Sequence, residues 1–216
     1  MRVVVTGTDP RVAERLRSEG FEVAECPLVR IEPLDGPPLR ADGYDWVVLT
    51  SRNAVEELLR RVEGPLPRVA AIGPGTAQAL REHGVEPAVV ARRSTQEGLV
   101  ADLPRPVGSV LFAGAQDARD VLVRELGADF LPLYRTIEVR PKEVPRGDLA
   151  TVASPSAARA LAALGAGLPC VSIGPLTTAE AEAGGLAVVV EADTHDLDGL
   201  VRAVKLAASR AGSSPS

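Results

Sequence analysis

The sequence contains few aromatic residues, and this shortage excludes one class of partner. Phe, Trp and Tyr make up 3% of the 216 residues, whereas a surface that stacks on nucleic-acid bases needs aromatic platforms. The net charge of −5 points the same way, because binding to a phosphate backbone depends on Lys and Arg. We therefore expect no nucleic-acid partner. A small anionic ligand held by local groups stays open.

Histidine, cysteine and long apolar runs are also scarce. With only His83 and His195, a histidine-rich metal site is disfavoured, and we expect no metal. Cys26 and Cys170 form no CxxC pair, which predicts two buried free thiols. No apolar run approaches the roughly 20 residues of a membrane span, and the N-terminus becomes polar too soon for a signal peptide. These features predict a soluble cytoplasmic protein without a membrane partner.

The two halves of the chain resemble each other. The segment Ile72–Val100 aligns without a gap with Ile173–Val201, and both begin with IGP and end with GLV. Upstream of each lies a second matching pair, LTSRNAVEELL and VASPSAARALAAL. A third, weaker pair begins near Val3 and Val110, and each copy is followed by a Pro-Leu-apolar-Arg run. A period of half the chain indicates two similar domains and not a solenoid.

Each repeat consists of short apolar runs, loops of Gly, Ser, Thr and Pro, and helical periods. After the apolar run Val47–Leu49, one helix face is spaced as in an amphipathic helix, through Val55, Leu58, Leu59 and Val62. Helices near 10–19, 75–83 and 116–126 are each followed by a glycine, the usual helix stop. Alternating strands and helices predict an α/β fold of two similar domains, each a parallel sheet flanked by helices.

Proline-rich segments mark where the chain would cross between the domains. The candidates are Pro27–Pro38 and Leu133–Pro145. If both are linkers, residues 1–31 join residues 139–216 in one discontinuous domain, and residues 34–135 form an inserted partner. A split into 1–108 and 109–216 fits the repeat equally well. The tail SRAGSSPS, residues 209–216, is expected to be disordered.

The loops after the expected strands are the candidate ligand sites, because ligands bind at the carboxyl ends of strands in open α/β sheets. They are rich in Gly, Ser and Thr, and they lead into helix N-termini, which favour anions. Facing loop sets from two domains would form a cleft that suits a ligand with many carboxylates. The loops are Thr6–Thr8, Thr50–Asn53, Gly73–Thr76, Gly114–Asp117, Ser154–Ser156 and Gly174–Thr177.

The same residues also have purely structural interpretations. Ser51 and Ser154 could simply cap helices, and Gly73 and Gly174 could serve tight strand-to-helix turns. Tyr134, near the second crossing, is either a packing residue or a phenol at the mouth of a cleft. The sequence has no Walker A motif, no GxGxxG motif and no nucleophile–base pair, so nucleotide binding and covalent catalysis lack support.

Taken in order, these strings resemble the uroporphyrinogen-III synthase family along nearly the whole chain: TSRNAV, IGPGTAQAL, VLFAGAQDARDVL, PLYRT, ASPSAARAL, IGPLTTAEA and DGLV. The resemblance implies two α/β domains joined by a two-stranded linker, with the first domain built from both chain ends. It also implies a cofactor-independent lyase. Such an enzyme dehydrates and cyclises hydroxymethylbilane to uroporphyrinogen III with inversion of ring D. We expect it to act as a monomer.

The resemblance also assigns site residues. Tyr134, in the YRT string, matches a tyrosine that assists departure of the substrate hydroxyl. The expected substrate-binding residues are Ser51, Arg52, Asn53, Gly73, Thr76, Gly114, Ser154, Ser156, Gly174 and Thr177. The sequence departs from the family at Leu176, where many members carry a second threonine. The alternative function is a two-domain binding protein that closes on an anionic ligand without turnover.

Overall fold

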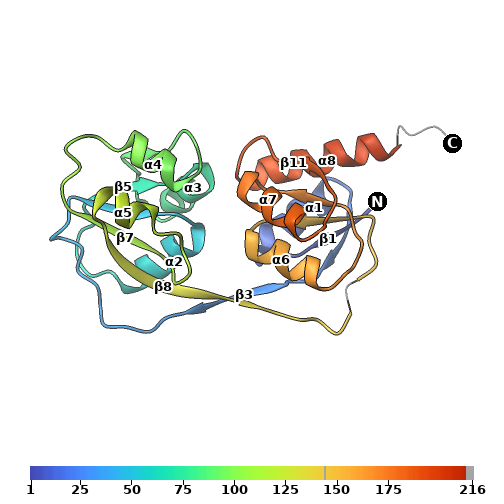
Figure 1. The fold of residues 1–216 in the computed structure, drawn as a ribbon, viewed down its shortest axis with the longest axis horizontal. Helices are drawn as coiled ribbons and strands as arrows, with labels where there is room; N and C mark the ends of the chain where they lie inside the picture. The colour runs from blue at the N-terminus through green and yellow to red at the C-terminus, as the bar shows by residue number, and fades with distance from the viewer. Residues whose placement is uncertain (144, 213–216) are drawn as a thin grey trace. The chain divides into compact units, whose positions relative to one another are not determined.

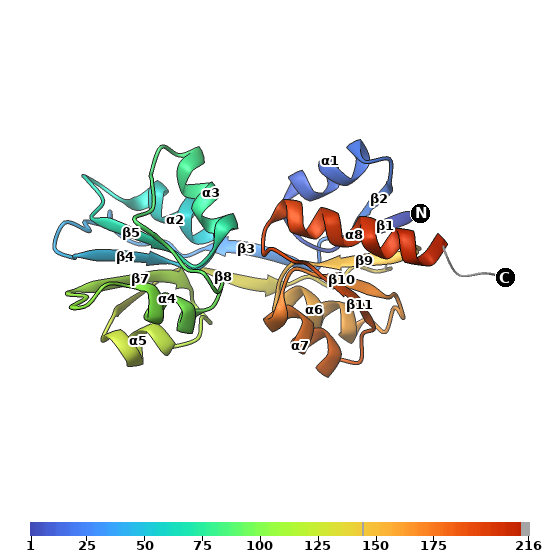
Figure 2. The same cartoon turned by 90° about the horizontal axis from the view of Figure 1, so that it is seen from above.

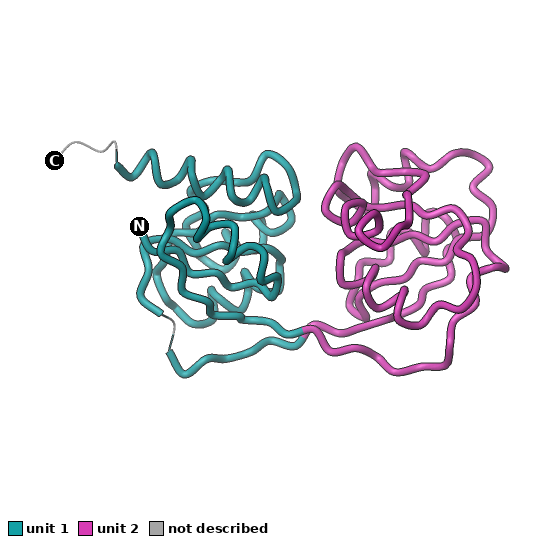
Figure 3. The backbone as a smooth tube through the Cα atoms, turned by 180° about the vertical axis from the view of Figure 1, so that it is seen from behind, with its two compact units in different colours: residues 1–30, 137–216 teal, residues 31–136 magenta. Residues whose placement is uncertain are grey.

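The computed structural model describes residues 1–143 and 145–212, and the chain divides into two compact units. Unit 1 comprises Met1–Arg30 and Ile137–Ser216, and unit 2 comprises Ile31–Thr136 (Figure 3). The chain passes between the units in two strands, β3 (Val29–Pro33) and β8 (Asp129–Glu138), which are hydrogen-bonded neighbours. One unit is therefore assembled from both ends of the chain.

Unit 1 is built on a five-stranded parallel sheet in the order β11-β10-β9-β1-β2. Its strands are β1 (Arg2–Val5), β2 (Glu22–Glu25), β9 (Leu149–Val152), β10 (Cys170–Ser172) and β11 (Val188–Glu191). One face is covered by α1 (Pro10–Ser18) and α8 (Leu197–Gly212). The other face is covered by α6 (Pro155–Ala163) and α7 (Pro175–Ala183), as Figure 2 shows.

Unit 2 is built on a six-stranded sheet in the order β3-β8-β7-β4-β5-β6. Besides β3 and β8, its strands are β4 (Trp46–Leu49), β5 (Arg68–Ala71), β6 (Val89–Val90) and β7 (Val110–Ala115), and from β8 to β6 all neighbours are parallel. Helices α2 (Arg52–Arg61) and α3 (Pro74–Glu82) cover one face, and α4 (Gln96–Asp102) and α5 (Val121–Leu126) cover the other (Figures 1 and 2).

The repeat found in the sequence is present in the topology. By the sequence alignment, β4, β5, β6, β7 and β8 correspond to β9, β10, β11, β1 and β2. With this correspondence the two sheets have the same strand order. The register agrees as well, since Ala71 lies opposite Val90 as Ser172 lies opposite Glu191. The predicted α/β fold, with parallel sheets flanked by helices, is confirmed.

Because aromatic residues are few, Val, Leu and Ala make up most of both cores, although Trp46 and Phe112 are the largest fully buried side chains. The central strands are buried on both faces, which explains their continuous apolar runs: Val47, Val48 and Leu49 have no exposed surface. The predicted helix stops are also confirmed. Gly20 and Gly84 adopt φ values of 87° and 75°, a left-handed conformation that side chains with a Cβ rarely tolerate.

The glycine of the repeated GLV string has a packing role. A Cβ at Gly98 would lie 2.1 Å from the carbonyl oxygen of Arg93, and one at Gly199 would lie 2.1 Å from that of Thr194. The loop carbonyl therefore passes directly over the first turn of α4 and of α8. In both units a side chain two residues after that carbonyl caps the helix. Thr95 Oγ1 accepts the Gly98 N–H at 3.0 Å, and Asp196 Oδ1 accepts the Gly199 N–H at 2.8 Å.

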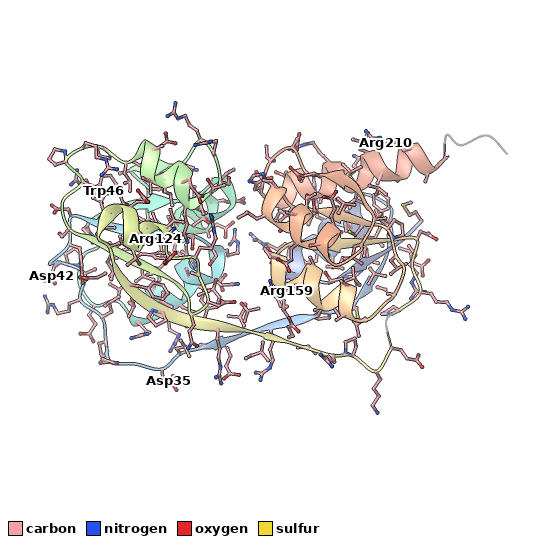
Figure 4. The ribbon with its side chains drawn as sticks, viewed as in Figure 1. Asp35, Asp42, Trp46, Arg124, Arg159 and Arg210 are labelled. Atoms are coloured by element: carbon pink, nitrogen blue, oxygen red, sulfur yellow. The ribbon has the colours of Figure 1, made fainter. Side chains whose placement is uncertain are left out.

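Two expected boundaries were wrong. The helix expected from residue 116 begins at Val121, because residues 116 and 117 form a turn after β7 and the Gln116 N–H donates to the carbonyl of Tyr134. The tail was expected to be disordered from Ser209, but 209–212 continue α8, and Arg210 (Figure 4) donates to the carbonyl of Val189 at 3.4 Å. The rest of that expectation, residues 213–216, lies outside the described residues.

A buried amide ties α4 to α5 and provides a test of the packing in unit 2. The Gln96 side chain is 4% exposed; it donates to the carbonyl of Arg119 at 2.8 Å and accepts from the Leu122 N–H at 3.3 Å. Gln96→Leu would leave both backbone groups unsatisfied. We expect it to lower the free energy of unfolding by about 1–3 kcal/mol in chemical denaturation. Gln78→Leu, on the exposed face of α3, should change it by less than about 0.5 kcal/mol, and equal effects would contradict this role.

Candidate active site

In each sheet, strands that follow one another along the chain are added first on one side of a central pair of strands and then on its other side. In unit 1 this pair is β1 and β9, and in unit 2 it is β7 and β4. The loops that follow the two strands of such a pair diverge, so the carboxyl edge of the sheet opens there and ligands bind. The predicted residues Ser51 and Gly114 lie at this place in unit 2. Ser154 lies at the equivalent place in unit 1, after β9.

Ser51 both caps a helix and contacts Tyr134. Its backbone is extended (φ −161°, ψ 160°), and its Oγ accepts the N–H of Ala54 at 3.0 Å, which caps α2. The same Oγ lies 2.8 Å from the hydroxyl of Tyr134, and either oxygen could donate. Both interpretations of Ser51 drawn from the sequence, cap and site residue, are therefore compatible with its geometry.

The phenol of Tyr134 is held in its neutral form. Tyr134 lies in β8 opposite Ala115, and only 5% of the residue is exposed. Burial raises its pKa above the ordinary value, and the negative charge of Asp117 adds to this. Hydrogen bonding by the side chains of Ser51 and Asn53 acts in the opposite direction. At neutral pH the group is therefore a neutral phenol, with a proton that it can donate, and not a phenolate.

The remaining predicted residues of unit 2 lie around this pair on neighbouring strand ends. Arg52 begins α2 and forms an ion pair with Glu82 at 2.7 Å, so its guanidinium already has a protein partner. Gly114 is packed close to its neighbours, since a Cβ there would lie 3.1 Å from the ring of Phe112. Thr76 lies in the first turn of α3 and is 5% exposed.

The sequence assigned the glycine of each IGP string to a tight turn, but the structure requires glycine there for a different reason. Gly73 and Gly174 have φ values of 179° and 166°, extended backbone that any residue adopts. The constraint is close approach: a Cβ on Gly73 would lie 2.3 Å from Ser94 Oγ, and one on Gly174 would lie 2.7 Å from His195 Cδ2. Ser94 and His195 are equivalent in the repeat and come from the loops before α4 and α8.

The loops of unit 1 repeat the arrangement without the phenol. Ser154 caps α6 by accepting the N–H of Ala157 at 3.1 Å, and its Oγ lies 3.1 Å from that of Ser156. Thr177, the equivalent of Thr76, lies in the first turn of α7 and is 3% exposed. The unit therefore presents a row of hydroxyl and backbone groups at its strand ends.

The sequence analysis missed one polar network in unit 1. Thr178 Oγ1 lies 2.6 Å from the buried Ser172 Oγ and also donates to the carboxylate of Glu191. The repeat alignment held the signal for it. The equivalent positions in unit 2 are all apolar: Ala71, Ala77 and Val90. The alignment matches three polar residues of unit 1 with three apolar residues of unit 2, and this difference can be seen in the sequence alone.

These features define a class of protein. Parallel α/β units carry Gly, Ser and Thr at the strand ends and at helix N-termini, an arrangement that suits an anionic small molecule. No group of three His, Cys, Asp or Glu residues that could hold a metal ion is found in residues 1–143 and 145–212. In the same ranges no helix combines the length and the apolar character needed to cross a bilayer. In unit 2 these groups include the buried phenol of Tyr134, hydrogen-bonded to Ser51.

Comparison with known proteins identifies the family. Residues 10–202 match the family model described as uroporphyrinogen-III synthase HemD. A uroporphyrinogen-III synthase of Synechococcus elongatus is 25% identical over 240 aligned positions, which cover 92% of this chain and 91% of the relative. The chain belongs to the uroporphyrinogen-III synthase family, whose members are cyclising lyases of tetrapyrrole biosynthesis, as the sequence predicted.

Solved structures agree on the fold. The Helicobacter pylori uroporphyrinogen-III synthetase superposes with a TM-score of 0.66 at 18% identity, covering 97% of this chain and 100% of that one. A mutant uroporphyrinogen III synthase of Thermus thermophilus gives a TM-score of 0.65 at 19% identity, covering 97% and 99%. At this level of identity the likeness supports the fold alone.

The raised pKa of Tyr134 can be measured. In a spectrophotometric titration, the difference between the native chain and Tyr134→Phe should show a phenol that ionises above the ordinary pKa of about 10. A folded-state pKa above the unfolded value contributes stability that is present below pH 10 and is lost as the pH rises further. Tyr134→Phe should therefore lose less stability above pH 10. Ser51→Ala should raise the pKa further, and a Tyr134 midpoint at or below 10 would count against the burial argument.

Proposed function

We propose that the chain dehydrates and cyclises hydroxymethylbilane to uroporphyrinogen III, with inversion of ring D. The observation that carries the proposal is the neutral Tyr134 phenol, hydrogen-bonded to Ser51 at the carboxyl edge of the unit 2 sheet, in a chain of this family. A neutral phenol can donate a proton to a leaving hydroxyl, and a phenolate cannot. We propose Tyr134 as the catalytic residue in this role.

The reaction needs one proton and a controlled geometry. The electron-rich terminal pyrrole expels its hydroxyl as water when Tyr134 donates the proton, and this leaves an azafulvene-type cation. The substituted carbon of ring D then attacks the cation, and the spiro intermediate breaks its bond between ring D and the ring C methylene. The chain recloses through the unsubstituted α-carbon of ring D, with ring D inverted, and loss of the proton from that carbon restores the neutral phenol. Cyclisation without inversion competes in solution. Holding the chain in the productive fold can contribute roughly 7–11 kcal/mol, which exceeds the contribution expected of one proton donor.

Binding of the substrate carboxylates is assigned to both units. We assign the unit 2 contacts to Ser51, Arg52, Asn53, Gly73, Thr76 and Gly114, and the unit 1 contacts to Ser154, Ser156, Gly174 and Thr177. The support is that these residues stand at strand ends and in first turns of helices, where unpaired backbone N–H groups attract anions. Because Gly73 and Gly174 have no side chain, their contribution would come from backbone groups.

The assembly and location of the chain follow as part of the same proposal. The free thiols of Cys26 and Cys170 are both buried, as suits a reducing compartment such as the cytoplasm. The exposed large apolar side chains of the described residues are few and come from different elements of both units, which favours a monomer. We also propose that residues 1–31 with 139–216, and residues 34–135, act as the two domains.

The function is tested by the isomer that the chain produces. Purified protein is supplied with freshly generated hydroxymethylbilane, and the oxidised type I and type III porphyrins are separated by chromatography. We expect type III in clear excess over a control without protein. Type I alone, from protein whose folding is confirmed by circular dichroism, would contradict the synthase activity. It would favour the alternative, a protein that binds an anionic ligand without turnover.

The role of Tyr134 is tested against the other tyrosine of the chain. Tyr134→Phe removes the proton donor, and we expect kcat to fall by about 10²-fold, the low end of the usual range for proton transfer, because the pyrrole can expel its hydroxyl unaided. KM should change little. Tyr44→Phe removes a hydrogen bond to Asp129 at the opposite edge of the sheet and should leave kcat unchanged. An unchanged kcat in Tyr134→Phe would mean that the phenol only packs.

A further inference from the structure

Unit 1 contains a cavity that the proposed proton transfer does not use. It lies at the carboxyl ends of β1 and β2 and has a volume of about 250 Å³. Val5, Pro27 and Val29 line it with apolar surface, and Thr8 and Arg30 line it with a hydroxyl and a guanidinium. All the lining residues come from the first 30 residues of the chain, so the cavity belongs entirely to this unit.

The repeat places this cavity at the position that Tyr134 fills in unit 2. The run Pro27-Leu28-Val29-Arg30 aligns with Pro132-Leu133-Tyr134-Arg135, so Val29 is the counterpart of Tyr134. The Leu28 N–H donates to the carbonyl of Thr6 at 3.0 Å and holds the run beside the end of β1. Where unit 2 has a buried phenol ring, unit 1 has a smaller side chain and an open space.

The charges around the cavity favour an anionic group at its rim. Asp9 and Glu25 also line it, but each carboxylate forms an ion pair with an arginine outside the lining, Arg11 at 2.5 Å and Arg17 at 2.6 Å. Their negative charge is therefore largely offset. Arg30 supplies a guanidinium with five N–H donors, which can keep a protein partner and still bind a carboxylate.

Size and chemistry together define the ligand. Pockets for drug-sized ligands usually measure about 300–1,000 Å³, so this cavity can take one small ring and not a whole tetrapyrrole. We propose that it is the subsite for one pyrrole ring of the linear tetrapyrrole, with the ring against Val5, Pro27 and Val29 and a ring carboxylate at Arg30 and Thr8. This inference rests on the proposed function and assigns the residues of a part of that site.

The subsite is tested with a single pyrrole that cannot turn over. Porphobilinogen, which carries one acetate and one propionate on one ring, is titrated into the isotopically labelled full chain, and the amide signals are followed by NMR. We expect saturable shifts at Gly7 and Thr8, with a Kd of roughly 1 mM for a ligand of this size. Val29→Tyr, which gives unit 1 the side chain of unit 2, should weaken binding at least 10-fold.

A second variant changes an exposed residue, so that its effect on binding is separate from any effect on folding. Arg30 lies at the surface, and Arg30→Gln should weaken porphobilinogen binding about 10-fold. In the synthase reaction it should raise KM about 10-fold and leave kcat unchanged, because it removes binding common to the ground and transition states. The matched control is Arg135→Gln at the equivalent position of unit 2, which should change the porphobilinogen Kd by less than 2-fold.

The outcomes separate the subsite from the function. Type III product from the native chain, with no amide shifts at Gly7 and Thr8 or with equal binding in Arg30→Gln and Arg135→Gln, overturns the subsite and leaves the synthase in place. Type I product alone from folded protein overturns the synthase, and the subsite with it. Type III product together with shifts at Gly7 and Thr8, and with binding weakened about 10-fold or more in Val29→Tyr and Arg30→Gln, supports both.

Discussion

The architecture depends on the parallel pairing of two strands at the centre of each unit. In unit 2 this pair is β4 and β7, and in unit 1 it is β1 and β9, whose partners Val3 and Leu149 come from opposite ends of the chain. The pairing buries apolar runs on both faces and fixes which loops meet at the carboxyl edge. The residues of the candidate site take their places from this pairing, because they lie in these strands or their neighbours, or in the loops and helix first turns that follow them.

The duplication has kept the frame and changed the chemistry at equivalent positions. The two sheets share their strand order, their glycines beneath a loop carbonyl and their helix caps. The side chains at the strand ends differ, since Tyr134 corresponds to Val29 and Ala77 corresponds to Thr178. Tyr134 and Ala77 belong to the buried core of unit 2, so these exchanges change core side chains while the strand order is kept. The two units therefore share a frame and differ in the side chains at their strand ends.

A site without an acid–base pair is consistent with this chemistry. Burial disfavours charge, so the environment that keeps the Tyr134 phenol neutral also keeps it able to donate. Ser51 contacts that phenol while it also caps α2, so one hydroxyl serves both the helix and the hydrogen bond to Tyr134. A substrate that can expel its own hydroxyl needs little covalent help, so the proposed chemistry does not require an acid–base pair.

The sequence alone determined what depends on local periodicity and local turns: the α/β class, the duplication, the serine caps and the glycine stops at Gly20 and Gly84. It could not determine where α5 begins or that residues 209–212 continue α8, because hydrogen bonds to Tyr134 and Val189 decide these boundaries. It also assigned Gly73 to a turn, whereas Ser94 on another loop imposes the glycine. Ser51 and Tyr134 are 83 residues apart, and only strand order and register bring their hydroxyls to 2.8 Å.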